Sequence, residues 1–208
     1  MDALLNPISP EAPSPEGART LRQLAAELEA RIPGATGHSR RVARYAAGVA
    51  RHLGLPRERV ARLRWAAALH DIGKLKLPPR VVNKPGPLSE LEYAMVRRHA
   101  AIGARIVARF ADGELAAIVR HHHERFDGSG YPDGLAGERI PLGARVVAVA
   151  DTFDAITSAR PYQPAKRHHE ALELLADEAG TQLDPEVVAV FHDFFAGPRE
   201  MPLRVLAR

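Results

Sequence analysis

The chain has 208 residues and no cysteine, so it is long enough for one domain with a full-sized core, while disulfides, thiolate nucleophiles and cysteine-based zinc sites are excluded. Hydrophobic residues make up 46% of the chain and aromatic residues only 5%, and alanine, leucine and valine predominate, a composition that favours helices. The net charge of +4 favours an anionic ligand through electrostatic steering. No recognition motif accompanies the arginines, so we expect no nucleic-acid binding.

The first residues predict neither a membrane anchor nor a secretion signal. No apolar run approaches the ~18 residues that cross a bilayer, and the start lacks both the basic and the continuous apolar segment of a signal peptide. We therefore expect a cytoplasmic protein with no membrane partner. Four prolines among few apolar residues indicate a flexible lead over residues 1–18, and we expect the folded domain to span residues 19–208.

Helical periodicity without alternating strands or internal repeats predicts an all-α domain, a single helical bundle. Capping boxes are predicted at Thr20 with Gln23 and at Ser89 with Glu92. In the long helix that follows Ser89, we expect four apolar side chains to lie inside: Met95, Ile102, Ile106 and Val107. The predicted helices cover residues 20–32, 36–53, 57–71, 89–110, 114–121, 141–159, 168–179 and 184–195.

Six of the ten histidines lie near the ends or inner faces of these helices: His38, His70, His99, His121, His122 and His123. Asp71 follows His70 directly, and Asp151 lies inside the apolar run VVAVADTF. Burial of a carboxylate in such a run is costly unless a cation or hydrogen-bond donors neutralise it. A metal ion is the simplest neutraliser, because imidazole and carboxylate ligands from separate helices of a bundle can converge on first-row divalent ions.

Each residue alone is weak evidence for a metal site. We interpret His52, His168 and His169 as ordinary core or surface side chains. The His-Asp pair also occurs at His192 and Asp193, where no other ligands gather. Only the whole set of residues therefore indicates a metal centre.

Several segments together resemble the successive motifs of one family, in its order: GHSRRVARYA, AAALHDIGK, VVNKPGPLSELEYAMVRRHAAIGARI, HHERFDGSGYPDGLAGERIP and ARVVAVADTFDAITSARPY. The family is HD-GYP, the cyclic di-GMP phosphodiesterases within the HD hydrolase superfamily. The resemblance covers roughly residues 36–195. It implies an HD-type helical bundle in which the Gly/Pro-rich segment is the GYP loop that lines a substrate cleft.

The resemblance also implies the roles of individual residues. One divalent ion would be held by His38, His70 and Asp151, the other by His99, His122 and His123, and Asp71 would bridge both. His121 stays outside this set. Iron, manganese, nickel and zinc all accept these ligands, so the metal is not identified. Substrate contacts would come from Lys74, Tyr131, Arg160 and the position of Gln163, with Lys74 and Asp71 as the catalytic residues.

Two positions depart from the family pattern. Members with a third metal carry a glutamate four residues before the first histidine, where this chain has Gly34, so we expect two ions. Gln163 stands where a basic side chain is common, and a glutamine cannot neutralise a phosphate. This second departure puts substrate affinity in question rather than metal binding.

The function implied by the resemblance is hydrolysis of cyclic di-GMP to linear pGpG, and onward to GMP, by a hydroxide that bridges two metal ions. The alternative is a metal-containing receptor, or a module that docks a GGDEF-type cyclase, with little or no turnover. Another cyclic dinucleotide as substrate also stays open. A GGDEF-domain protein or a second copy of the chain is the expected protein partner.

Overall fold

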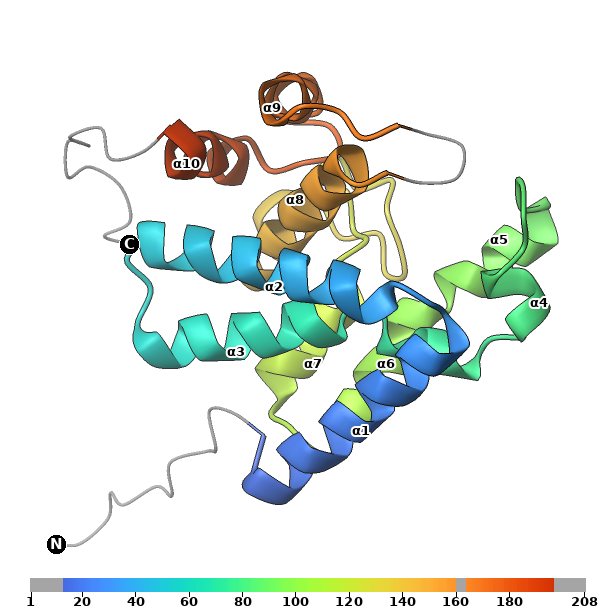
Figure 1. Ribbon diagram of the computed structural model, residues 1–208. Helices are drawn as coiled ribbons and strands as arrows, with labels where there is room; N and C mark the ends of the chain where they lie inside the picture. The colour runs from blue at the N-terminus through green and yellow to red at the C-terminus, as the bar shows by residue number, and fades with distance from the viewer. Residues whose placement is uncertain (1–12, 160–163, 197–208) are drawn as a thin grey trace, which may run out of the picture.

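Figure 1 shows the computed structural model, which describes residues 13–159 and 164–196. Within these ranges the chain forms helices and no β-strand, with one isolated bridge between Ala179 and Leu183. The predicted all-α fold is therefore confirmed. The α-helices are α1 Pro15–Arg31, α2 Ala35–His52, α3 Arg57–Leu69, α4 Pro79–Val82, α5 Glu90–Arg97, α6 His99–Val107, α7 Gly113–His121, α8 Leu142–Thr157, α9 His168–Asp177 and α10 Pro185–Ala196, and two 3-10 helices cover η1 Ile72–Lys76 and η2 Gly137–Arg139. None of these helices is long and apolar enough to cross a membrane.

The core lies between α2, α3, α7 and α8. Helix α2 packs against α3 and α8, and α7 packs against α6 and α3 (Figure 1). Small and branched side chains fill the contact between α2 and α8, and Tyr45 meets Phe153 edge to face with ring centroids 5.2 Å apart. Phe191 of α10 closes this cluster, with its ring centroid 5.0 Å from that of Phe153. The two helices that carry His38 and Asp151 are thus held rigidly together.

The first helix begins earlier than the sequence pattern predicts. Helix α1 starts at Pro15, and the Ser14 hydroxyl accepts a hydrogen bond of 3.1 Å from the Gly17 amide. The predicted start at Thr20 is therefore wrong, and residues 15–18 of the expected flexible lead are helical. The physical reason is that proline fits the first turn of a helix, where its missing N–H needs no partner. Residues 1–12 lie outside the described residues.

The predicted long helix 89–110 is divided into α5 and α6 at Arg98. The Ser89–Glu92 capping box is confirmed. Helix α5 has no fully buried residue. Of the four expected core residues, only Val107 is fully buried, while Met95, Ile102 and Ile106 are partly buried. The break gives α5 and α6 separate directions, so that α6 can pack against η1.

Two glycines permit the close contact between η1 and α6. A Cβ at Gly73 would lie 2.0 Å from the His99 carbonyl oxygen and 2.6 Å from the Gly103 nitrogen. Both distances fall far inside van der Waals contact, so no larger residue fits there without a backbone shift. This approach places Asp71, at the start of η1, next to His99 at the start of α6.

We predict that Gly73→Ala lowers the free energy of unfolding by about 1–3 kcal/mol, because the new methyl group overpacks the contact with α6. Thermal unfolding monitored by circular dichroism measures the loss. Gly113→Ala is the matched control, because a Cβ at Gly113 meets no atom within 4 Å and this variant should unfold near the wild-type temperature. A Gly73→Ala protein as stable as the control would contradict the close packing described above.

Candidate metal centre

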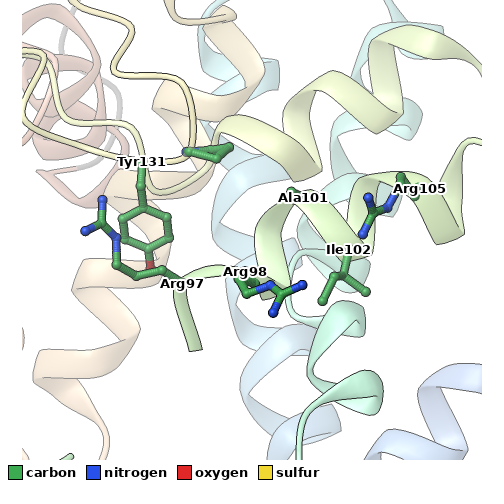
Figure 2. Close-up of a pocket in the computed structure, with 7 residues that line it drawn as sticks. Arg97, Arg98, Ala101, Ile102, Arg105 and Tyr131 are labelled. Atoms are coloured by element: carbon green, nitrogen blue, oxygen red, sulfur yellow. The ribbon is translucent and has the colours of Figure 1, made fainter. Parts of the chain in front are cut away.

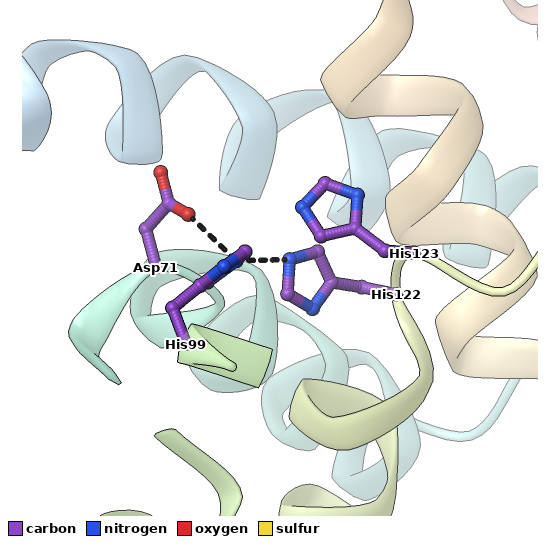
Figure 3. Close-up of side chains that lie close together, drawn as sticks. All are labelled: Asp71, His99, His122 and His123. Carbon is purple, nitrogen blue, oxygen red and sulfur yellow. Dashed lines mark hydrogen bonds and ion pairs between the residues drawn. The ribbon is translucent and has the colours of Figure 1, made fainter. Parts of the chain in front are cut away.

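The seven side chains predicted as metal ligands come from five parts of the fold and converge on one place. His38 lies on α2, His70 and Asp71 lie between α3 and η1, and Asp151 lies on α8. His99 opens α6, and His122 and His123 follow at the end of α7. Asp71, His99, His122 and His123 each offer one ligand atom within 4.8 Å of the others (Figure 3). His38, His70 and Asp71 form a second such group, so Asp71 belongs to both.

Asp151 completes the group around His38 and His70. Its Oδ1 lies 3.1 Å from Nε2 of His38 and 3.9 Å from Nε2 of His70. Nε2 of His70 lies 3.6 Å from Oδ2 of Asp71. The carboxylates of Asp71 and Asp151 therefore flank the same imidazole.

On the other side of Asp71, imidazoles face one another. Nε2 of His99 lies 3.3 Å from Oδ1 of Asp71 and 3.3 Å from Nε2 of His122. Figure 3 shows the His99 ring between Asp71 and His122, with His123 beside them. The ring centroids of His99 and His123 are 5.0 Å apart.

Three of the buried imidazoles are held in the same way by the backbone. Nδ1 of each donates to the carbonyl oxygen three residues earlier, at the C-terminal end of a helix or of the turn before α6. These bonds are His70 to Ala67 at 2.7 Å, His99 to Val96 at 2.6 Å and His122 to Val119 at 2.7 Å. With the proton on Nδ1, each Nε2 turns a lone pair toward the centre, which is the tautomer that binds a metal ion.

Burial favours the neutral form of His70, His122 and His123. It lowers the pKa of His70, lowers the pKa of His122 well below its ordinary value, and lowers the pKa of His123 to about 4. Nε2 of His99 and Nε2 of His122 lie 3.3 Å apart while Nδ1 of each ring bonds to the backbone, so a cation between or beside them would give both inward nitrogens a partner. A divalent cation fits this donor set of imidazoles and carboxylates.

The two carboxylates are ionised. Burial opposes ionisation of Asp71, but the Lys74 ammonium holds its pKa well below the usual range. Desolvation likewise opposes ionisation of Asp151, while the hydrogen bond from His38 lowers its pKa. Nζ of Lys74 lies 2.6 Å from Oδ2 of Asp71 and is partly exposed, so one cationic side chain reaches the rim of the centre.

Asp154 supports the centre and was not predicted from the sequence. Its carboxylate is 1% exposed, and Oδ2 lies 2.8 Å from Nδ1 of His38. Arg41 donates to both of its oxygens, at 2.6 and 3.0 Å. Desolvation opposes protonation of His38, but its hydrogen bonds to Asp151 and Asp154 raise its pKa to about 9. A cation bound at Nε2 would take the place of the proton that Nε2 shares with Asp151. A second carboxylate three residues after Asp151, in the same apolar run, was the signal available in the sequence.

Glu124 is a second residue that sequence reasoning missed, and it holds the Gly/Pro-rich loop that follows it. It is 3% exposed, and its two oxygens accept from the backbone amides of Asp133 at 2.7 Å and Leu135 at 3.2 Å. A Cβ at Gly130 would lie 2.2 Å from the Arg125 nitrogen, so the loop can fold back onto this segment only with glycine there. The acid that directly follows the paired histidines was the available signal.

His121 stays apart from the seven residues, on the far side of the loop. Nδ1 of His121 bonds to the Ala117 carbonyl oxygen at 2.9 Å, and Nε2 lies 2.9 Å from Oδ2 of Asp133. Arg120 donates twice to the same carboxylate, at 2.7 Å each. His121, Glu124 and Asp133 are close enough to hold a metal ion, but Arg120 and the loop amides already occupy their acceptors. This group holds the loop in place.

The loop brings Tyr131 to the edge of the centre. The Tyr131 amide donates to the His123 carbonyl oxygen at 3.2 Å, and the two ring centroids are 4.9 Å apart. Burial raises the pKa of Tyr131, so its phenol is protonated at neutral pH and can donate a hydrogen bond. Arg160 and Gln163, the other two expected substrate contacts, lie outside the described residues.

The chain is similar to known proteins over most of its length. The family model described as HD domain matches residues 22–187. The cyclic di-GMP phosphodiesterase response regulator RpfG of Xanthomonas campestris pv. campestris is 47% identical over 172 residues, which are 81% of this chain and 46% of that protein. The 3'3'-cGAMP-specific phosphodiesterase 3 of Vibrio cholerae is 40% identical over 163 residues, which are 78% of this chain and 35% of that protein. The matched segment thus spans less than half the length of either relative.

A solved structure shows the same fold. The cyclic GMP-AMP-specific phosphodiesterase V-cGAP3 of V. cholerae matches with a TM-score of 0.65 at 21% identity, covering 87% of this chain and 49% of that chain. The resemblance indicated by the sequence motifs is therefore confirmed by the matched family model and by the sequence relatives.

We predict that Asp154→Asn weakens the binding of a divalent ion by about 10–100-fold, because His38 loses the carboxylate that orients its ring. Titration of manganese into metal-free protein, followed by calorimetry, measures the affinity.

Arg41→Gln is the matched control for this prediction. It removes the ion pair with Asp154 but leaves the hydrogen bond between Asp154 and His38, so its metal affinity should stay close to wild type. Circular dichroism checks that both variants fold. Equal manganese affinity in Asp154→Asn and wild type would show that Asp154 does not support the centre.

Proposed function

Because the chain belongs to the HD domain family, we propose that it is a metal-dependent phosphodiesterase that hydrolyses cyclic di-GMP to pGpG and onward to GMP. The observation that carries this proposal is the convergence of imidazole Nε2 atoms and carboxylates around Asp71, which is shared by two groups of ligand atoms. Relatives named as phosphodiesterases of cyclic di-GMP and of 3'3'-cGAMP support the substrate class.

We assign the ligands as the sequence motifs imply. His38, His70 and Asp151 would hold one cation and His99, His122 and His123 the other, with Asp71 between them. Gly34 lies one helical turn before His38 and has no side chain, which supports two ions rather than three. Iron, manganese, nickel and zinc are all compatible with this mixture of nitrogen and oxygen ligands.

Hydrolysis adds water across one P–O3' bond, so the product carries a 5'-phosphate and a free 3'-hydroxyl. A pair of bound cations would supply a water of lowered pKa and would stabilise charge on the phosphate oxygens. Asp71 and the buried imidazoles fix where the scissile phosphate binds. Lys74, ion-paired with Asp71 and partly exposed, lies where it can donate to a phosphate oxygen as negative charge grows there.

Residues beside the centre would position the rest of the substrate. Tyr131 keeps its proton and can donate to the ligand from the loop. Arg160 and Gln163 are proposed as substrate contacts on the sequence alone. Whether cyclic di-GMP or another cyclic dinucleotide is preferred depends on such contacts, since the relatives' names include both cyclic di-GMP and 3'3'-cGAMP.

The alternative function is a metal-containing receptor for the nucleotide, or a module that docks a GGDEF-domain protein. Gln163 favours this alternative because it lacks the positive charge that would neutralise a phosphate. A second copy of the chain is the other candidate partner. Turnover distinguishes an enzyme from a receptor.

We predict that the purified, metal-loaded protein converts cyclic di-GMP to pGpG, measured by chromatography. His70→Ala should lose bound metal and turnover together. Lys74→Ala should keep its metal while turnover falls by about 10²-fold, because a charge that stabilises the transition state is lost.

Lys76→Ala is the matched control, because Lys76 lies in the same 3-10 helix, is exposed and makes no ion pair within residues 13–159 and 164–196. It should retain wild-type turnover. Tight binding of cyclic di-GMP without product at any metal loading would identify a receptor and contradict the proposed enzyme.

A further inference from the structure

A pocket lined by none of the seven residues of the centre has Tyr131 in its wall (Figure 2). Its volume is about 320 Å³. One wall is a stripe along the start of α6, where Arg98, Ala101, Ile102 and Arg105 recur at helical spacing. Arg97 at the end of α5 and the Tyr131–Pro132 segment of the loop form the opposite wall.

The pocket is strongly positive. Three of the seven lining residues are the exposed arginines Arg97, Arg98 and Arg105. No acidic side chain lines the pocket. In the described part of the chain, none of these three arginines forms an ion pair; the ion pairs of arginine there are formed by other arginines. Guanidinium groups left without carboxylate partners around one pocket suit a phosphate, which accepts two of their N–H donors at once.

The rest of the pocket is flat and apolar. Ala101 and Ile102 lie between Arg98 and Arg105, and the Tyr131 ring and Pro132 face them from the loop. Cζ of Arg97 lies 4.7 Å from the centroid of the Tyr131 ring, so a guanidinium plane and an aromatic ring stand together. Surfaces of this kind bind nucleobases by stacking, while basic side chains hold the adjoining phosphate.

Tyr131 connects the pocket to the centre. Its ring is 4.9 Å from that of His123, and Arg98 directly precedes His99 on the chain. Ligand pockets in proteins run from about 300 to 1,000 Å³, so a pocket of about 320 Å³ is at the small end of that range and fits part of a cyclic dinucleotide better than the whole molecule. A dinucleotide with one phosphodiester at the centre can therefore place its other half here.

We propose that Arg97, Arg98 and Arg105, with Tyr131 and Pro132, form a subsite for the nucleotide unit of the substrate remote from the scissile bond. The second phosphate binds the guanidinium groups, and its base lies against the Tyr131–Pro132 surface. This assignment depends on the proposed function for the identity of the ligand. It gives a binding role to three arginines for which the resemblance implied none.

The test compares two substrates in the double variant Arg97→Gln, Arg105→Gln. The KM for cyclic di-GMP should rise by about tenfold with kcat within about twofold, because these contacts are equally present in the ground state and the transition state. Hydrolysis of bis(p-nitrophenyl) phosphate, a phosphodiester without a second nucleotide, should not change. An unchanged KM, or an equal loss on both substrates, would overturn the subsite.

Arg109→Gln is the matched control. Arg109 is also exposed and also lies over an aromatic ring, 5.8 Å from the centroid of Phe110, but it does not line the pocket. It should behave as wild type on both substrates. A KM increase in this variant equal to that of the double variant would assign the effect to net charge and overturn the subsite.

Calorimetric binding separates this inference from the proposed activity. If the wild-type protein binds cyclic di-GMP without hydrolysing it, the proposed function fails, while a tenfold weaker Kd in the double variant still supports the subsite. GMP should compete with cyclic di-GMP for the wild-type protein. Simultaneous binding of GMP and cyclic di-GMP would show a separate nucleotide site and overturn the assignment to the substrate.

Discussion

The structure brings together buried imidazole Nε2 atoms and carboxylate oxygens whose lone pairs need a positively charged partner. Backbone carbonyl oxygens accept hydrogen bonds from Nδ1 of three buried histidines, so Nε2 of each ring points inward. Nε2 of His99 and Nε2 of His122 are 3.3 Å apart. Burial lowers the pKa of His70 and of His122, which favours their neutral forms. The ionised Asp71 and Asp151 add negative charge at the same place. A cation satisfies all these groups at once, and this requirement explains why so many polar side chains are buried together.

The surrounding fold supplies rigidity to this centre from several directions. Asp154 holds His38 from behind and is itself held by Arg41. Glycine contacts between η1 and α6 bring Asp71 to His99. Glu124 fastens the loop that carries Tyr131 against the histidine segment. Each ligand is thus positioned by contacts made away from the centre, which leaves the inward atoms free for a cation and a phosphate.

Positive charge lies in two separate places near the centre. Lys74 lies at the rim beside Asp71, and the three arginines of the pocket lie beyond Tyr131. A cyclic dinucleotide carries two phosphates joined through two nucleoside units, so two separated positive regions match it better than one. If the proposed function holds, the metal centre would carry out cleavage, and the contacts around it would distinguish one cyclic dinucleotide from another, as the names of the relatives differ in their substrates.

Local signals in the sequence were enough to predict the helical class and the capping box at Ser89, because helix periodicity and capping involve neighbours within a few residues. The set of histidines and aspartates indicated which residue types form the centre. The start of α1 was predicted too late, because the prolines were interpreted as a loop although Pro15 fits the first turn of a helix. The sequence pattern also joined α5 and α6 into one helix across Arg98. Asp154 contacts His38, and Arg105 lines one pocket with Tyr131, although the members of each pair lie far apart in the chain. Such pairs follow from how helices pack, including the approach that Gly73 permits, and no pattern within one segment contains that information.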